Sequence, residues 1–157
     1  MLYRWFRHGG LRARRYIYLE WDALTTAPVR DFYAEVWDRD AAGSTAVLVE
    51  RDPGWYWFRQ ADRLPPHLRP KAGGIVPLNG VLLSHRALAA VAGGEIPPGV
   101  FSELRLGTLL RHAGFEMGEL PGPKRAMNSF DRGLVAFDAG RPGIYHPIKQ
   151  GRTAGET

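Results

Sequence analysis

The chain contains no cysteine among its 157 residues. This excludes disulfide bonds, thiolate metal ligands and cysteine nucleophiles, and it fits a reducing compartment. The sequence also lacks an apolar run near the roughly 18 residues of a membrane span, and its N-terminus lacks the apolar core of a signal peptide. We therefore expect no integral membrane segment and a cytoplasmic location.

Acidic residues are missing from the first fifteen positions, which hold five arginines. The other 142 residues hold 16 basic and 16 acidic groups, so the net charge of +5 comes from that short segment. A nucleic-acid binder usually spreads basic charge over a face of its fold, and we expect no nucleic-acid partner here. A binder of anionic surfaces that works through the arginine-rich start is an alternative reading.

The length predicts one domain, and the 19 glycines and 12 prolines predict many turns. Short apolar runs predict strands at 16–19, 45–49 and 134–137, and residues 74–83 predict extended structure interrupted by Pro77 and Asn79-Gly80. Residues 55–58 are a strongly aromatic run, whose conformation the sequence leaves open. Apolar residues at helical spacing predict helices over 29–40, 85–93 and 102–115, with Ser84 and Ser102 as the N-caps of the last two. Strands that alternate with short helices predict an α/β domain over residues 1–149, and the polar residues 150–157 predict a disordered tail.

Two carboxylates follow the first predicted strand, in the sequence Glu20-Trp21-Asp22. On a continuing strand, residues two apart point to the same side, and the carboxyl end of a strand is where α/β sheets bind ligands. Hard oxygen ligands in such a place suit Mg²⁺ or Mn²⁺. The alternative is a pair of solvated acids, one of them paired with Arg14 or Arg15.

An apolar strand that ends in acid-x-acid, followed by a hydroxyl-rich turn, resembles the DxD element of nucleotide-sugar-dependent glycosyltransferases with the GT-A fold. The resemblance implies that Glu20 and Asp22 bind Mn²⁺ or Mg²⁺, which bridges the two phosphates of a nucleoside-diphosphate sugar. It also implies transfer of the sugar to a hydroxyl group of a glycan or another acceptor.

Two later segments match the same family in order along the chain. The resemblance implies that Glu103, in the sequence FSEL, is the catalytic base, although glutamate is also favoured at helix N-termini. In the sequence IYHPIK, it implies that His146 is a further metal ligand and that Lys149 reaches the diphosphate.

Acceptor contacts are expected from the middle of the chain. The segment GGIVPLNG, which includes Asn79, resembles the acceptor-binding loop of GT-A enzymes. Trp55 and Trp57 would face alike on a strand and could stack on a sugar ring. The alternative for these tryptophans is the hydrophobic core. His67, His85 and His112 have no acid at a spacing that would build a metal site, so we expect them on the surface.

The resemblance covers residues 3–149 and implies a partial GT-A-like mixed sheet with flanking short helices. GT-A domains open with a βαβαβ nucleotide-binding half, whereas about fifteen residues precede the first strand here. The expected domain is therefore incomplete at its N-terminus, either as part of a longer gene product or as a protein that works without that half. A non-catalytic carbohydrate-binding remnant is a second alternative.

Overall fold

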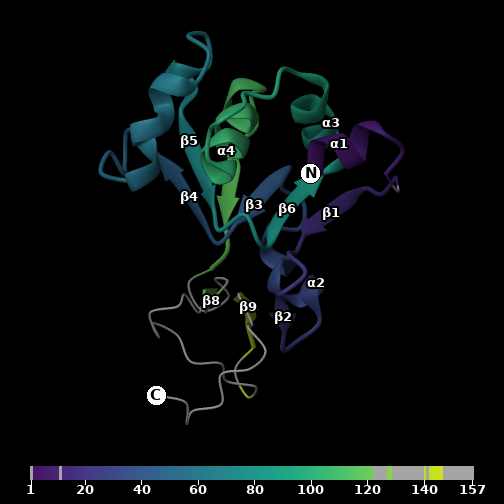
Figure 1. Ribbon diagram of the computed structural model, residues 1–157. Helices are drawn as coiled ribbons and strands as arrows, with labels where there is room; N and C mark the ends of the chain where they lie inside the picture. The colour runs from purple at the N-terminus through teal and green to yellow at the C-terminus, as the bar shows by residue number, and fades with distance from the viewer. Residues whose placement is uncertain (1, 11, 122–126, 129–139, 141, 147–157) are drawn as a thin grey trace, which may run out of the picture.

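The computed structural model describes residues 2–10, 12–121, 127–128, 140 and 142–146. The described chain is a mixed α/β fold with a mixed, open sheet and short helices (Figure 1). The main sheet has the strand order β1-β6-β3-β7, in which β3 and β7 are parallel and the other neighbours are antiparallel. Its strands are β1 (Arg15–Tyr18), β6 (Val81–Ser84), β3 (Ala41–Gly43) and β7 (Met117–Glu119).

Two smaller sheets complete the strands. One is the antiparallel pair of β4 (Thr45–Leu48) and β5 (Gly73–Val76). The other has the order β2-β9-β8, with β2 at Leu24–Thr25, β9 at Ile144–His146 and β8 at Met127–Asn128. The helices are α1 (Leu2–Arg7), α2 (Val29–Phe32), α3 (His85–Gly93) and α4 (Ser102–His112), with 3₁₀ turns η1 (Ala34–Val36), η2 (Tyr56–Arg63) and η3 (Arg69–Lys71).

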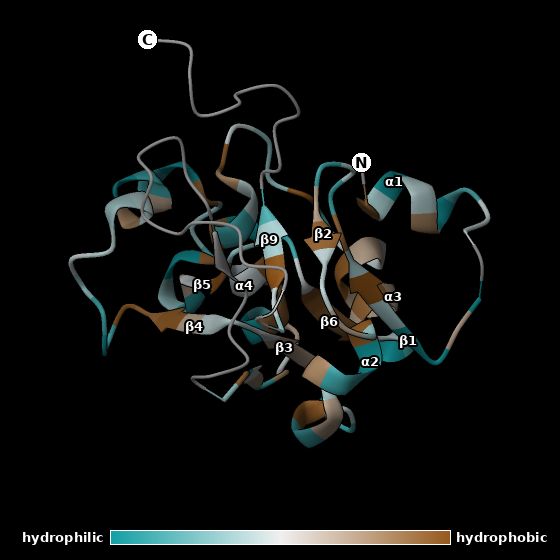
Figure 2. Ribbon diagram, turned by 90° about the horizontal axis from the view of Figure 1, so that it is seen from below, coloured by the Kyte–Doolittle hydropathy of each residue, from teal (hydrophilic) through white to brown (hydrophobic). Residues whose placement is uncertain are grey.

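The main sheet separates two hydrophobic clusters because side chains alternate along each strand. On β6, Val81 and Leu83 face the larger cluster, while Leu82 faces the smaller one. Helices α3 and α4 supply the larger cluster, and the α2–η1 segment with Ile144 of β9 supplies the smaller. Figure 2 shows hydrophobic residues concentrated on the strands. Ile144 of β9 is buried in the smaller cluster, and this burial holds β9 against the rest of the domain.

Helix α4 lies directly on β5, backbone against backbone. A Cβ atom added to Gly107 of α4 would lie 2.5 Å from the carbonyl oxygen of Gly73 and 2.7 Å from the Cα of Gly74. Thr108 adds a buried side-chain contact, since its hydroxyl accepts the N–H of Gly73 at 3.2 Å. This contact fixes the start of α4, which carries Glu103, relative to the β5–β6 connection.

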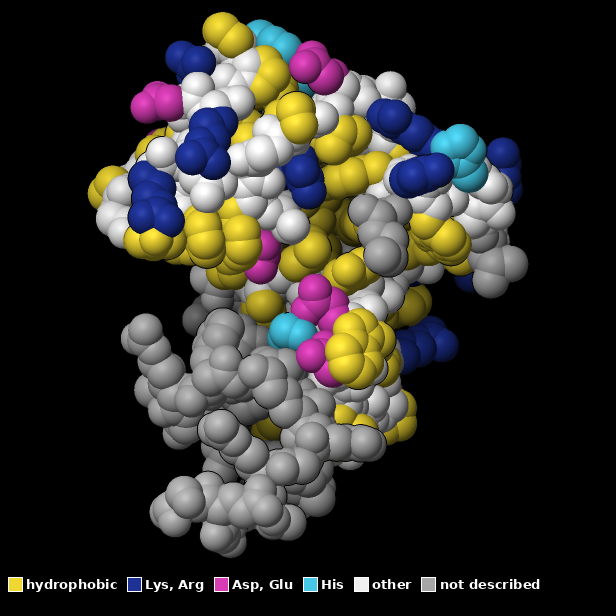
Figure 3. Space-filling view, in the orientation of Figure 1, with side chains coloured by type: hydrophobic (Ala, Val, Ile, Leu, Met, Phe, Trp, Pro, Cys, Tyr) yellow, Lys and Arg dark blue, Asp and Glu magenta, His cyan; other side chains and the backbone are white. Residues whose placement is uncertain are grey.

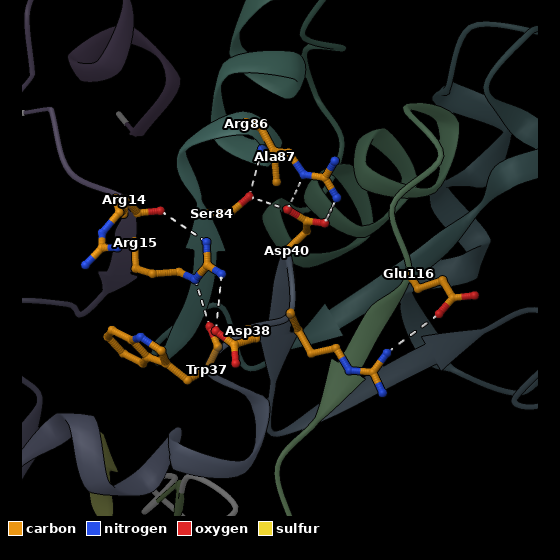
Figure 4. A network of polar contacts seen from close by, with 10 residues as sticks. Arg14, Arg15, Trp37, Asp38, Asp40, Ser84, Arg86, Ala87 and Glu116 are labelled. Carbon is orange, nitrogen blue, oxygen red and sulfur yellow. Dashed lines mark hydrogen bonds and ion pairs between the residues drawn. The ribbon is translucent and has the colours of Figure 1, made fainter.

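A polar network ties β1, β3 and the start of α3 together (Figure 4). The carboxylate of Asp40 accepts the hydroxyl of Ser84 at 2.7 Å and the Nε–H of Arg86 at 2.6 Å. Ser84 in turn accepts the N–H of Ala87 at 3.1 Å as the N-cap of α3. This confirms the predicted cap of that helix.

Several predicted elements differ in the structure. The aromatic run at 55–58 is not a strand, because those residues enter the 3₁₀ turns of η2, where the N–H of Phe58 donates to the carbonyl of Trp55 at 2.9 Å. The helix predicted over 29–40 is divided into α2 and η1. Helix α4 is confirmed, but its N-cap is Phe101 rather than Ser102. The strand predicted over 134–137 and the tail over 150–157 lie outside the described residues. Among the helices that are described, none has the length and apolar character needed to cross a membrane.

Candidate metal centre and the groups around it

Glu20, Asp22 and His146 converge on one point, although more than 120 residues separate the histidine from the acids. The Nε2 atom of His146 lies 2.7 Å from Oε2 of Glu20 and 3.1 Å from Oδ1 of Asp22. The three side chains are 33%, 17% and 21% exposed, respectively, so each keeps an edge open to a ligand. Figure 3 shows acidic and histidine side chains side by side near the middle of the molecule, next to an exposed hydrophobic group.

The strand register explains why these side chains meet. Leu24 of β2 pairs with Tyr145 of β9, and Thr25 pairs with Ile144. In an antiparallel pair, one further step places His146 opposite the residue that follows Asp22. The pair is fastened at its other end, where the N–H of Gly143 donates to the hydroxyl of Thr26 at 2.9 Å. Ile144 and Tyr145 are fully buried, so β9 cannot slip without exposing them.

The two acids do not lie on a continuing strand, and that part of the interpretation is wrong. Strand β1 ends at Tyr18, and a tight turn follows, in which the N–H of Ala23 donates to the carbonyl of Glu20 at 3.0 Å. The turn still aims both carboxylates at His146 and leaves Trp21 between them 96% exposed. Among the described residues, the basic side chain within 4 Å of both carboxylates is this histidine and not Arg14 or Arg15.

The donor set fits a hard divalent cation. Two carboxylate oxygens and one imidazole nitrogen lie within 4.8 Å of one another. Adjacent ligands of an octahedral Mg²⁺ or Mn²⁺ are about 3 Å apart, because each bond is about 2.1 Å long. The two measured separations from His146 match that spacing. Carboxylate oxygens suit Mg²⁺ and Mn²⁺, and imidazole is also a ligand of Zn²⁺ and other transition metals.

The carboxylate of Glu103, which is not one of the three clustered side chains, faces the same region from the first turn of α4. Its Oε1 accepts the N–H of Leu78 at 3.4 Å. Burial raises the pKa of Glu103, and the negative charge of Glu20 adds to that effect, while its own N–H, that of Leu78 and His146 oppose it. A carboxyl group whose pKa is raised toward neutrality is better suited to accept a proton from a substrate.

Asn79 lies in the β5–β6 connection and contacts Glu20. Its Oδ1 accepts the N–H of Glu20 at 3.0 Å, and the side chain is buried, with 2% of the residue exposed. The predicted contact of Asn79 with an acceptor stays a prediction, because the observed contact of this side chain is with the metal-site turn. The backbone N–H of the neighbouring Leu78 donates to Glu103, so the β5–β6 connection is hydrogen-bonded to both Glu20 and Glu103.

Tyr18 belongs to the same cluster and was not predicted. Burial raises its pKa, and the carboxylates of Glu20 and Glu103 raise it further. The signal was present in the sequence, since Tyr18 precedes Glu20 by two residues at the end of a strand. Its hydroxyl group stays protonated near neutral pH and can donate to an anion.

Trp55 and Trp57 have packing partners of their own. The ring of Trp55 lies against Gly74, where an added Cβ would be 2.4 Å away, and meets Phe58 edge-on at 5.1 Å. The ring of Trp57 stacks on Phe101 with centroids 3.7 Å apart. Because they do not share a strand, they do not face alike. Trp55 therefore packs against the hydrophobic core, as the alternative interpretation expected. A role in stacking on a sugar ring stays a prediction for the half-buried Trp57.

Lys149 and three further histidines were also considered in the sequence. Lys149 lies outside the described residues, so its predicted contact with a diphosphate stays a prediction. His67 and His112 are exposed as expected, with their rings 5.5 Å apart. His85 is half-buried instead, because its Nδ1 is hydrogen-bonded to the hydroxyl of Tyr16 at 3.0 Å. The described acid and histidine side chains form one cluster with metal-ligand spacing, that of Glu20, Asp22 and His146.

Comparison of the chain with protein-family models, with curated proteins and with solved structures found no match.

Proposed function

We propose that this protein is a metal-dependent glycosyltransferase, in which Glu20, Asp22 and His146 hold Mn²⁺ or Mg²⁺ at the diphosphate of a nucleoside-diphosphate sugar. The observation that carries the proposal is the convergence of these three side chains, with Nε2 of His146 at 2.7 and 3.1 Å from the two carboxylates. The cation supplies positive charge that offsets the charge of the two phosphates.

Glu103 is the proposed base. The oxygen of an acceptor hydroxyl group forms a bond to the anomeric carbon of the sugar, and the bond between that carbon and the phosphate oxygen breaks. The hydroxyl proton passes to the carboxylate of Glu103, and the nucleoside diphosphate leaves with the bonding electron pair. A base is needed because a sugar hydroxyl is a poor nucleophile until its proton is removed.

The support for Glu103 is its position. It starts the helix that β5 fixes in place, its carboxyl group is half-buried, and Glu20 and His146 both influence its pKa. A carboxyl group beside the cation site, but not among its three ligands, is placed to accept a proton from a substrate held there. The predicted second role of this residue, favourable interaction with the helix N-terminus, is compatible with that position.

A non-catalytic carbohydrate-binding protein is the less favoured reading. That alternative needs both tryptophans on one open surface, and the structure buries part of Trp55 against β5. Glycan binding that survives both chelation and the Asp22→Ala change would favour this reading over ours.

Calorimetry on the full chain tests the proposal, with uridine, guanosine and adenosine diphosphates as probes and Mn²⁺ present. We expect at least one of them to bind more tightly when Mn²⁺ is present, and we expect EDTA or Asp22→Ala to remove this Mn²⁺-dependent part of its binding. Asp38→Ala is the matched control, because Asp38 is fully exposed and lies on another element. If the protein binds Mn²⁺ but none of the diphosphates, the glycosyltransferase proposal is overturned and a metal site of another kind remains.

A further inference from the structure

A pocket away from the metal centre is lined by basic side chains. It has a volume of about 420 Å³ and lies between α1, the α3–α4 connection and α4. The residues that line it are Tyr3, Arg4, Arg7, His8, Ile96 and Arg105. Figure 3 shows Lys or Arg side chains gathered with a histidine on the side of the molecule where α1 lies in Figure 1. Three guanidinium groups therefore surround one hollow that has no carboxylate in its lining.

Backbone carbonyl groups hold two of these arginines in place. The Nε of Arg7 donates to the carbonyl of Ala92, and its Nη2 donates to that of Gly94 at 2.6 Å. Nη1 of Arg105 donates to the carbonyl of Pro97 at 3.3 Å. A guanidinium group has five N–H donors, so both arginines are fixed in orientation and keep donors for a ligand. The Nε of Arg105 is buried without a hydrogen-bond partner.

The described part of the chain supplies no counter-charge to this pocket. The ion pairs of its arginines with acids involve Arg15, Arg39, Arg51, Arg86 and Arg111, none of which lines the pocket. The nearest acid in the connecting loop, Glu95, is exposed and forms no ion pair with Arg4, Arg7 or Arg105. Burial raises the pKa of Tyr3 to about 12, against the lowering effect of Arg105, so its hydroxyl group is neutral and can donate.

We propose that this pocket binds a phosphate monoester or diphosphate group. Guanidinium groups bind phosphate oxygens in pairs, and several of them around one hollow match a tetrahedral group with more than one negative charge. Clustered like charges repel one another, and a polyvalent anion removes that cost. The group belongs either to a soluble phosphorylated molecule or to the headgroup of an acidic lipid.

The pocket works independently of the metal centre. Arg105 follows Glu103 by two positions on α4, and side chains two apart on a helix do not face each other. The two sites therefore lie on different sides of α4. Phosphate binding at this pocket requires no cation, and the loss of Asp22 leaves it intact.

Two binding measurements on the full chain at low salt, with EDTA present, test this inference. Calorimetry measures the affinity for inorganic pyrophosphate, and vesicle sedimentation compares phosphatidylcholine alone with phosphatidylcholine that contains phosphatidic acid. The variants are Arg4→Gln and Arg4→Glu, since Arg4 is exposed and we expect its replacement to leave the fold intact. Arg59→Gln is the control, because Arg59 is an exposed arginine on η2.

We expect Arg4→Gln to weaken binding about tenfold or more, because a hydrogen bond to a charged group contributes roughly 1.5–3 kcal/mol. Arg4→Glu weakens it further, and Arg59→Gln and Asp22→Asn leave it unchanged. Binding of pyrophosphate identifies a soluble ligand, and binding of the acidic vesicles alone identifies a lipid headgroup. The inference is overturned if neither probe binds, or if Arg4→Glu binds as tightly as the wild type. Neither result bears on the metal centre.

Discussion

Asn79 holds the turn that carries the metal-site acids: its side-chain oxygen accepts the N–H of Glu20 at 3.0 Å across 59 residues of sequence. We predict that Asn79→Ala lowers the free energy of unfolding by about 1–3 kcal/mol, because it leaves a half-buried N–H without a partner. It also weakens Mn²⁺ binding, since Glu20 is no longer oriented. Urea unfolding and a Mn²⁺ titration measure the two effects.

The control for this change is Thr108→Val, which removes a buried side-chain contact to the backbone of Gly73 away from the acids. It destabilises the fold and leaves Mn²⁺ affinity unchanged. Equal Mn²⁺ affinity in Asn79→Ala and the wild type would show that Asn79 stabilises the fold and has no role in metal binding.

Glu103→Gln separates chemistry from binding. If Glu103 is the base, the change lowers the rate of sugar transfer by about 10²–10⁴-fold and leaves the affinity for Mn²⁺ and nucleoside diphosphate nearly unchanged. Single-turnover kinetics and calorimetry measure the two quantities. Glu116→Gln is a control, because Glu116 is exposed and paired with Arg39. Full transfer activity in Glu103→Gln would remove Glu103 from the reaction.

Gly107→Ala tests the contact between α4 and β5. The added methyl group would meet the backbone of Gly73 and Gly74, which cannot move aside as a side chain does. We expect a loss of about 1–3 kcal/mol of stability or more, measured by thermal or urea unfolding. Gly93→Ala in α3 is the matched control, since nothing lies within 4 Å of its added Cβ. An unchanged midpoint in Gly107→Ala would contradict the packing described above.

The carboxyl group of Asp40 makes the free energy of unfolding depend on pH. Its hydrogen bond with Arg86 is the largest cause that lowers the pKa of Asp40 to about 2. Burial opposes this effect, and the hydrogen bond from Ser84 lowers the pKa further. A folded pKa below the unfolded value of about 3.9 means that the stabilisation is full above that value and is lost as the pH falls toward 2. Urea unfolding at several pH values should show this loss in the wild type and in Asp38→Asn, but a smaller one in Asp40→Asn. Identical pH profiles would contradict the assignment.

Sequence patterns predicted the elements whose signals are local. The helix at 102–112 was predictable from the spacing of its apolar residues. The N-cap at Ser84 was predictable because a serine directly precedes the helix that begins at His85. The division of 29–40 into α2 and η1 was not predictable, because the same buried stripe of Phe32, Tyr33 and Val36 fits one helix or two short ones. Packing on the sheet decided between them.

The candidate site was predictable as a set of residues and not as a geometry. The family resemblance grouped Glu20 and Asp22 with His146, and the structure brings them together. The hydrogen bond of Asn79 to Glu20 and that of Leu78 to Glu103 depend on contacts between distant segments, which a single sequence does not reveal. The aromatic run that contains Trp57 favours a strand by composition, whereas the structure has 3₁₀ turns there.

The most direct test of the central claim is a Mn²⁺ titration of the full chain followed by electron paramagnetic resonance, with the wild type compared with Asp22→Asn and His146→Ala. Asp22→Asn removes the negative charge of one ligand of the proposed site, and His146→Ala removes the imidazole ligand. We predict one bound Mn²⁺ per chain in the wild type and an affinity at least about tenfold weaker in each variant. A wild type that binds no Mn²⁺, or variants that bind it equally well, would contradict the metal site and leave the cluster as a polar contact that fastens β9 to the domain.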